Sequence, residues 1–109
     1  MWGLTRATRV FVRSGPTDLR LGFDGLYGVV ETQLKQDPLS GHVFVFCNRS
    51  RTRIKLLSWD GSGLWLCAKR LERGNFAWPR ADDREMEPAA LQALLAGLEV
   101  EGRRDWFRK

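Results

Sequence analysis

The fold is decided by residues 41–79, GHVFVFCNRSRTRIKLLSWDGSGLWLCAKRLERGNFAWP. Short apolar runs alternate with turn signals, a pattern typical of consecutive hairpin strands. Residues 43–47 form an uninterrupted apolar run, which predicts a central strand covered on both faces. The next strands are predicted at 52–59, 64–71 and 76–78, with Asp60-Gly61-Ser62-Gly63 as a hairpin turn. Four strands joined by short turns predict an antiparallel meander.

Before this stretch, residues 8–14 alternate in polarity and predict a first strand. From Thr17 onward apolar residues recur at spacings of three and four, which predicts an amphipathic helix ending near Lys35. Two starts fit this pattern. The helix begins at Asp18, capped by Thr17 or Asp18 itself, or it begins at Phe23 after an ordered loop. Glycines three apart would allow this helix to approach the sheet closely: Gly22, Gly25 and Gly28.

A final helix is signalled by Pro88 at a first-turn position, with Gly102 as its stop. Its apolar face is predicted from Leu91, Leu94, Leu95 and Leu98. The complete pattern predicts an α+β fold. It has an antiparallel meander of about four strands plus an N-terminal strand, and two helices packed on one face of the sheet. We expect residues 1–109 to form a single domain, with 103–109 as a flexible tail or a docking segment.

Charge is unevenly distributed along the chain. Residues 1–75 carry 12 Lys and Arg against 6 Asp and Glu, whereas residues 76–109 carry 6 against 7. Arginine supplies 14 of the 18 basic residues, and its forked guanidinium suits phosphate or carboxylate. Nucleic acid is therefore the leading partner class, with a solubility device or an acidic protein partner as the alternatives.

Several function classes find little support in the composition. No apolar run approaches the ~20 residues of a membrane span, and the N-terminus lacks the apolar core of a secretory signal, so we expect a cytoplasmic protein. Cys47 and Cys67 lie in apolar runs without metal-ligand spacing and are expected to be buried thiols. The single histidine, His42, is expected at the surface or at a strand edge. We predict no catalytic residue, metal or cofactor.

The basic residues of the hairpin region are the candidate nucleic-acid contacts: Arg49, Arg51, Arg53, Lys55, Lys69, Arg70 and Arg73. Alternation along a strand would place Arg51, Arg53 and Lys55 on one face and Ile54 and Leu56 on the other. Lys69 and Arg70 are adjacent, so only one of them can join this patch from within its strand.

Three segments carry a family resemblance: GPTDLRLGFDGL (15–26), residues 40–79, and the Pro- and Leu-rich final helix. Together they resemble the small accessory protein, often called TnpB or the second open reading frame, of the insertion-sequence-66 family of bacterial mobile elements. WDGSGLW followed by KRLERGNFAWP is the most specific part. The resemblance implies an accessory factor of transposition, encoded beside a larger transposase that carries the catalytic acids. It implies a process without a mechanism.

Five residues stand in the motifs that carry this resemblance, without an assigned role: Asp18, Arg20, Trp59, Asp60 and Gly61. From the residues alone, we expect Asp18 to cap the helix, Arg20 to pair with an acid, and Asp60 to belong to its turn. Trp59 and Trp65 flank that turn, where they either lie in the core or stack on unpaired bases.

Three functions fit these observations. The first is a DNA-binding accessory of transposition, which predicts a basic face and salt-sensitive binding. The second is a module that recruits or regulates the transposase without touching DNA, and it predicts an exposed apolar patch including the last helix or Trp106 and Phe107. The third is a nuclease dependent on Asp18 or Asp24, although the acidic residues form no convergent metal set. A homo-oligomer is compatible with each of them.

Overall fold

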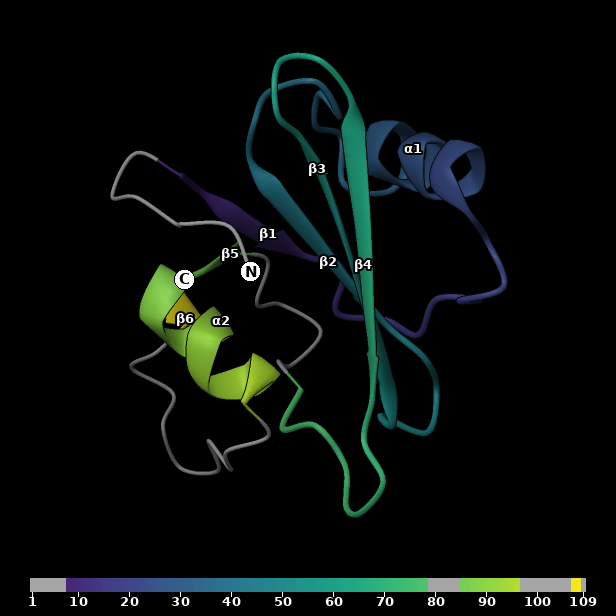
Figure 1. Ribbon diagram of the computed structural model, residues 1–109, viewed down its shortest axis with the longest axis vertical. Helices are drawn as coiled ribbons and strands as arrows, with labels where there is room; N and C mark the ends of the chain where they lie inside the picture. The colour runs from purple at the N-terminus through teal and green to yellow at the C-terminus, as the bar shows by residue number, and fades with distance from the viewer. Residues whose placement is uncertain (1–7, 79–84, 97–106, 109) are drawn as a thin grey trace.

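A computed structural model describes residues 8–78, 85–96 and 107–108, the last pair as backbone. These residues form a six-stranded sheet and two helices, which confirms the predicted α+β class (Figure 1). The elements are, in chain order, β1 (Val10–Val12), α1 (Phe23–Thr32), β2 (Val43–Cys47), β3 (Arg53–Trp59), β4 (Leu64–Arg70), β5 (Glu85–Met86), α2 (Pro88–Leu95) and β6 (Phe107–Arg108).

The strands lie in the order β4-β3-β2-β1-β5-β6. The predicted antiparallel meander is confirmed for β2, β3 and β4. β1 pairs in parallel with β2, with Val10 opposite Val43, because α1 carries the chain back across the sheet between these two strands. The sheet is therefore mixed, although most of its pairs are antiparallel.

Both faces of the sheet are covered, and the helices lie on opposite faces (Figure 1). Leu26 and Val30 of α1 pack with one cluster, completed by Phe11, Phe44, Phe46 and Leu57. Leu91 and Leu94 of α2 pack with the other cluster, which includes Val10, Val12, Val43, Val45, Ile54, Leu56 and Met86. The prediction that both helices pack on one face was wrong. β2 is apolar at every position, so each of its two faces needs a cover.

Helix α1 begins at Phe23, the later of the two predicted starts, and ends at Thr32 rather than Lys35. Its N-cap is Gly22, which provides no side-chain hydrogen bond, so the predicted Thr17 or Asp18 cap was wrong. Residues 17–22 instead form a loop. In this loop the buried Thr17 donates its backbone N–H to the Cys47 carbonyl at 2.8 Å.

The glycines do not bring α1 close to the sheet as predicted. A Cβ at Gly25 would lie 2.7 Å from Cδ2 of Leu21, a residue of the preceding loop. A Cβ at Gly28, or at the N-cap Gly22, would meet no described atom within 4 Å. The close approach is therefore between α1 and its own entry loop.

The predicted strand at 76–78 is not a strand. Phe76 donates its backbone N–H to the Arg51 carbonyl at 2.7 Å and buries its ring in the α2-side cluster. Its apolar side chain satisfied the strand pattern, but β4 remains at the edge of the sheet. The two-residue strand β5 was missed because its residues lie within the charged connection before α2 and are too few to show a period.

Helix α2 begins at Pro88, as predicted, and buries Leu91 and Leu94. The helix ends at Leu95 with Ala96 as its C-cap, and Leu98 and the predicted stop at Gly102 lie outside the described residues. Of the predicted tail 103–109, only 107–108 are described, as strand β6. No helix among residues 8–78 and 85–96 is long and apolar enough to cross a membrane.

Candidate nucleic-acid interface

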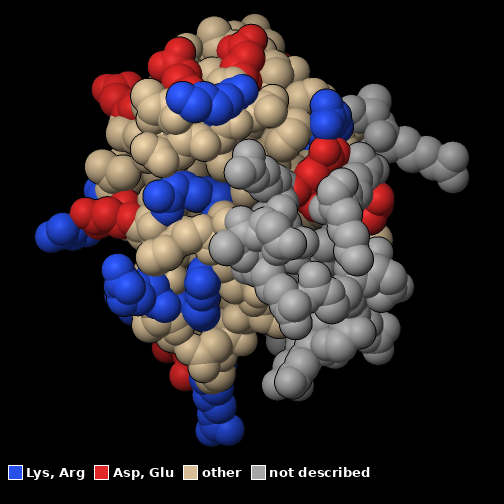
Figure 2. All heavy atoms as spheres, turned by 180° about the vertical axis from the view of Figure 1, so that it is seen from behind, with Lys and Arg blue, Asp and Glu red and all other residues tan. Residues whose placement is uncertain are grey.

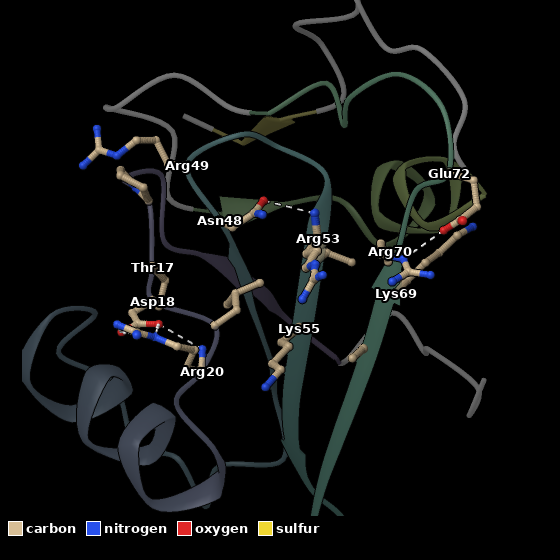
Figure 3. A pocket seen from close by; sticks show the side chains of 14 residues that line it. Thr17, Asp18, Arg20, Asn48, Arg49, Arg53, Lys55, Lys69, Arg70 and Glu72 are labelled. Carbon is tan, nitrogen blue, oxygen red and sulfur yellow. Dashed lines mark hydrogen bonds and ion pairs between the residues drawn. The ribbon is translucent and has the colours of Figure 1, made fainter.

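An open hollow of about 890 Å³ lies beside α1 on its face of the sheet. One wall is the loop at residues 16–20, and the rim includes the β2–β3 turn at Asn48 and Arg49. The floor comes from β3 and β4 (Figure 3). Its charged lining residues are the cations Arg20, Arg49, Arg53, Lys55, Lys69 and Arg70 and the acids Asp18 and Glu72.

Asn48 builds the turn that leads into β3. Its Oδ1 accepts the backbone N–H groups of Thr52 and Arg53, both at 3.0 Å. Its Nδ2 donates to the hydroxyls of Ser50 and Thr52 at 3.1 and 3.2 Å. An asparagine side chain thus replaces backbone partners inside the turn, which fixes where β3 begins. The candidate residues predicted from the sequence do not include Asn48, although an Asn between two strand-like runs is a turn signal.

Arg53 and Lys55 lie on the α1 side of β3, as alternation predicts. Arg53 is exposed and stands opposite Arg70 of β4, while Lys55 stands opposite the small Ala68. The Lys55 ammonium is half-buried and donates to the carbonyl of Leu21 at 3.2 Å. This bond ties the floor of the hollow to the loop that forms its wall.

Arg51 does not join Arg53 and Lys55, so its predicted place on their face was wrong. Its backbone has φ 61°, a left-handed conformation that interrupts the alternation before β3 begins. The guanidinium instead donates to the Ser14 carbonyl at 3.5 Å and lies 5.7 Å from the ring centre of Trp78. Trp78 packs with the cluster on the α2 side. Arg51 is thus a structural residue of the opposite face.

Lys69 and Arg70 divide between the two faces, as expected. Arg70 shares the side of Arg53, whereas Lys69 pairs with the buried Ile54 and its ammonium donates to the Leu95 carbonyl at the end of α2. Lys69 therefore borders the hollow without directing its charge into it. Arg73 is exposed in the turn after β4 and is not among the lining residues.

Asp18 and Arg20 form a pair at the rim of the hollow (Figure 3). Arg20 Nη2 lies 2.9 Å from Asp18 Oδ2, and the Arg20 backbone N–H donates to Asp18 Oδ1 at 3.0 Å. Hydrogen bonds from Arg20 lower the pKa of Asp18 to about 2. The predicted pairing of Arg20 with an acid is confirmed. Glu72 is paired in the same way, with Arg70 at 2.9 Å.

The two acids of the hollow are therefore already neutralised by neighbours. Among the described residues, the guanidinium groups of Arg49 and Arg53 have no hydrogen-bond or ion-pair partner. Lys55 bonds a neutral carbonyl. Lys and Arg side chains gather in the lower half of the face seen in Figure 2. This surplus of positive charge attracts anions.

Asp60 and Gly61 shape the β3–β4 turn. The Asp60 carboxylate accepts the backbone N–H groups of Ser62 and Gly63 and the indole N–H of Trp65. These hydrogen bonds, of which the one from the Ser62 backbone N–H has the largest effect, lower the pKa of Asp60 to about 2. Gly61 has φ 102°, a conformation for which glycine is suited. The predicted hairpin turn is confirmed.

The two tryptophans at this turn cannot form one stacking platform. Trp59 stands opposite Leu64 on the α1 side of the hairpin, whereas Trp65 stands opposite Ser58 on the α2 side. Trp65 is 54% exposed and Trp59 is half-buried.

The two cysteines and the histidine, the other side chains that could react chemically, are packed within the fold or hydrogen-bonded to its backbone. Cys47 is buried, and burial raises the pKa of its thiol, while Cys67 is half-buried. His42 Nδ1 accepts the Arg9 backbone N–H at 3.0 Å beside the start of β2. Within the described parts of the chain, no three His, Cys, Asp or Glu side chains gather as a metal site.

Comparison with known proteins identifies the family. A family model described as IS66 Orf2 like protein matches residues 8–105. The chain belongs to the IS66 Orf2-like family. This match includes the hollow, both helices and the Asp60 turn, and it confirms the resemblance seen in the motifs. It associates the chain with an accessory role in transposition.

Two similar proteins come from Sinorhizobium fredii (strain NBRC 101917 / NGR234). The protein titled "Uncharacterized protein y4hO" is 43% identical over 93 residues, covering 84% of this chain and 81% of its own length. "Uncharacterized protein y4jC" is 38% identical over 110 residues, covering 99% of this chain and 89% of its own. No solved structure matches this IS66 Orf2-like chain.

Proposed function

We propose that this IS66 Orf2-like protein is a non-catalytic accessory factor of transposition that binds DNA through the basic hollow. The observation that carries the proposal is the unpartnered guanidinium group of Arg53 next to Lys55 on the floor of the hollow, with the unpartnered guanidinium group of Arg49 at its rim. The acids nearby are engaged by Arg20 and Arg70, so they do not neutralise these three cations. Arginine forks match phosphate oxygens in geometry and charge.

The contact set is taken from the cations that line the hollow. We assign phosphate contacts to Arg53, Lys55 and Arg70 on its floor and to Arg49 at its rim, where the guanidinium extends outward (Figure 3). Lys69, Arg51 and Arg73 are left out of this set because their charges lie outside the hollow. Four phosphate contacts on duplex DNA would give a slope of log K against log salt of about −3.6.

The test measures binding of the full chain to labelled duplex from an element end, unrelated duplex and single-stranded DNA across a series of salt concentrations. Arg49→Ala with Arg53→Ala should weaken binding and reduce the slope by about 1.8, because two phosphate contacts are lost. Lys35→Asn with Arg73→Ala is the matched control, since it removes equal charge away from the hollow. Equal losses in both double variants, or no binding at low salt, would contradict the proposed site.

The alternative, docking to the transposase without DNA contact, predicted an exposed apolar patch on the last helix. The apolar residues Ala90, Leu91 and Leu94 of α2 are instead buried against the sheet. The side chains of Trp106 and Phe107 lie outside the described residues. The α2 residues that could form such a patch are therefore buried. DNA binding at the hollow has more support than this alternative.

A further inference from the structure

Strand β4 lies at one edge of the sheet, and no described strand pairs with its outer side. The hydrogen bonds to β3 fix which backbone groups point outward. Asp60 N–H donates to Gly63 O and Leu71 N–H donates to Thr52 O, so the odd-numbered residues of β4 direct their backbone groups toward β3. The outward N–H and C=O groups belong to Leu64, Leu66, Ala68 and Arg70.

This edge lacks most of the features that keep strand edges from pairing. It is seven residues long and contains no proline. Its first five residues, Leu64–Ala68, carry no charge. Lys69 has its ammonium bound at the end of α2, and Trp65 is 54% exposed beside the edge. An exposed, regular and largely uncharged edge is a template for another strand.

We propose that β4 pairs with β4 of a second copy of this chain, antiparallel about a two-fold axis at Cys67. This register uses all seven residues and places the outward groups of Leu66 opposite those of Ala68. Arg70 stands opposite Leu64, and Lys69 stands opposite Trp65, so no like charges face each other in this register. Moving the axis to Leu66 or Ala68 shortens the paired segment within β4.

The pairing joins the two sheets into one and keeps equivalent faces on the same side. Ala68 and Arg70 line the hollow, so the hollows of the two copies would extend toward each other across the axis. The dimer itself does not depend on DNA binding, and its test uses no DNA. Failure of one proposal is therefore distinguishable from failure of the other.

The first measurement is the mass of the full chain by light scattering and sedimentation across a range of concentrations. The second is oxidative crosslinking, because the two Cys67 residues face each other as a non-hydrogen-bonded pair at the axis. Cys67→Ser controls for the buried Cys47. Ala68→Pro removes an outward N–H from an edge position that tolerates proline, and Ala68→Val is its matched control with that N–H retained.

We expect a dimer that crosslinks through Cys67 in the wild type and in Ala68→Val, and a folded monomer in Ala68→Pro. A monomer at every concentration overturns the proposal. A dimer that neither crosslinks at Cys67 nor responds to Ala68→Pro also overturns it. If the proline variant does not fold, the Cys67 crosslink in the wild type decides.

Discussion

Arg53 of β3 and Arg70 of β4 lie directly opposite each other on the same face of the sheet. Like charges in this position destabilise a strand pair, and the salt bridge from Arg70 to Glu72 neutralises only one of the two guanidinium charges. The arrangement is unfavourable for folding and is the one expected where a polyanion binds.

Replacing Arg53 should therefore separate stability from binding. Arg53→Thr puts a good strand former at an exposed position and relieves the repulsion, so we expect the free energy of unfolding to rise by about 0.5 kcal/mol. The salt slope of duplex binding should fall by about 0.9. Urea denaturation and binding titrations check the two effects. A variant that is less stable and binds DNA as the wild type does would contradict this account.

Arg51 should behave in the opposite way. Arg51→Ala removes the bond to Ser14 and the contact with Trp78, which we expect to lower the free energy of unfolding by about 1 kcal/mol. The salt slope of DNA binding should remain that of the wild type. A slope reduced by about 0.9 would instead make Arg51 a phosphate contact.

The carboxylate of Asp60 should stabilise the hairpin in a pH-dependent way. Its pKa is about 2 in the folded chain against an ordinary 3.8, so its contribution is present above 3.8 and is lost as the pH falls toward 2. We expect Asp60→Asn to lower the melting temperature most at neutral pH, with the difference shrinking between pH 3.8 and 2. Glu31→Gln, at an exposed position of α1, controls for the lost charge. A difference that is constant with pH would exclude this role.

Two glycines of α1 form a matched pair. Gly28→Ala should raise the free energy of unfolding by about 0.5–1 kcal/mol, because alanine favours the helix and its Cβ meets no described atom within 4 Å. Gly25→Ala should instead lower it by about 1 kcal/mol, since its Cβ would lie 2.7 Å from Leu21 Cδ2. Thermal or urea unfolding of the two variants checks the difference. Equal gains would show that the Leu21 loop moves aside freely.

Several local features of the fold could be predicted from patterns in the sequence. The apolar run of β2 and the Asp60 turn are encoded in neighbouring residues, so period and turn chemistry predicted them correctly. The division of Lys69 and Arg70 between two faces also follows from alternation alone. These features need no information from distant parts of the chain.

The errors arose where distant segments meet or where one backbone angle breaks a pattern. Whether the two helices share a face depends on packing between segments far apart in sequence. The placement of Arg51 depends on a single positive φ that alternation cannot anticipate. Residues 16–20, which form the wall of the hollow, precede α1 in the chain and lie more than thirty positions before Arg53. The charge pattern of 49–55 therefore gave no indication of this wall.

The late start of α1 has a consequence for what the sheet can reach. The helix covers Leu57 of β3, but Lys55 and Arg53 on the same face remain beyond it. A helix begun at Asp18 would replace the loop that forms the wall of the hollow and would extend apolar cover toward these cations. Because α1 starts only after Gly22, which has no capping side chain, the helical layer leaves this part of the sheet uncovered. The length of α1 thus determines how much of this face of the sheet a ligand can contact.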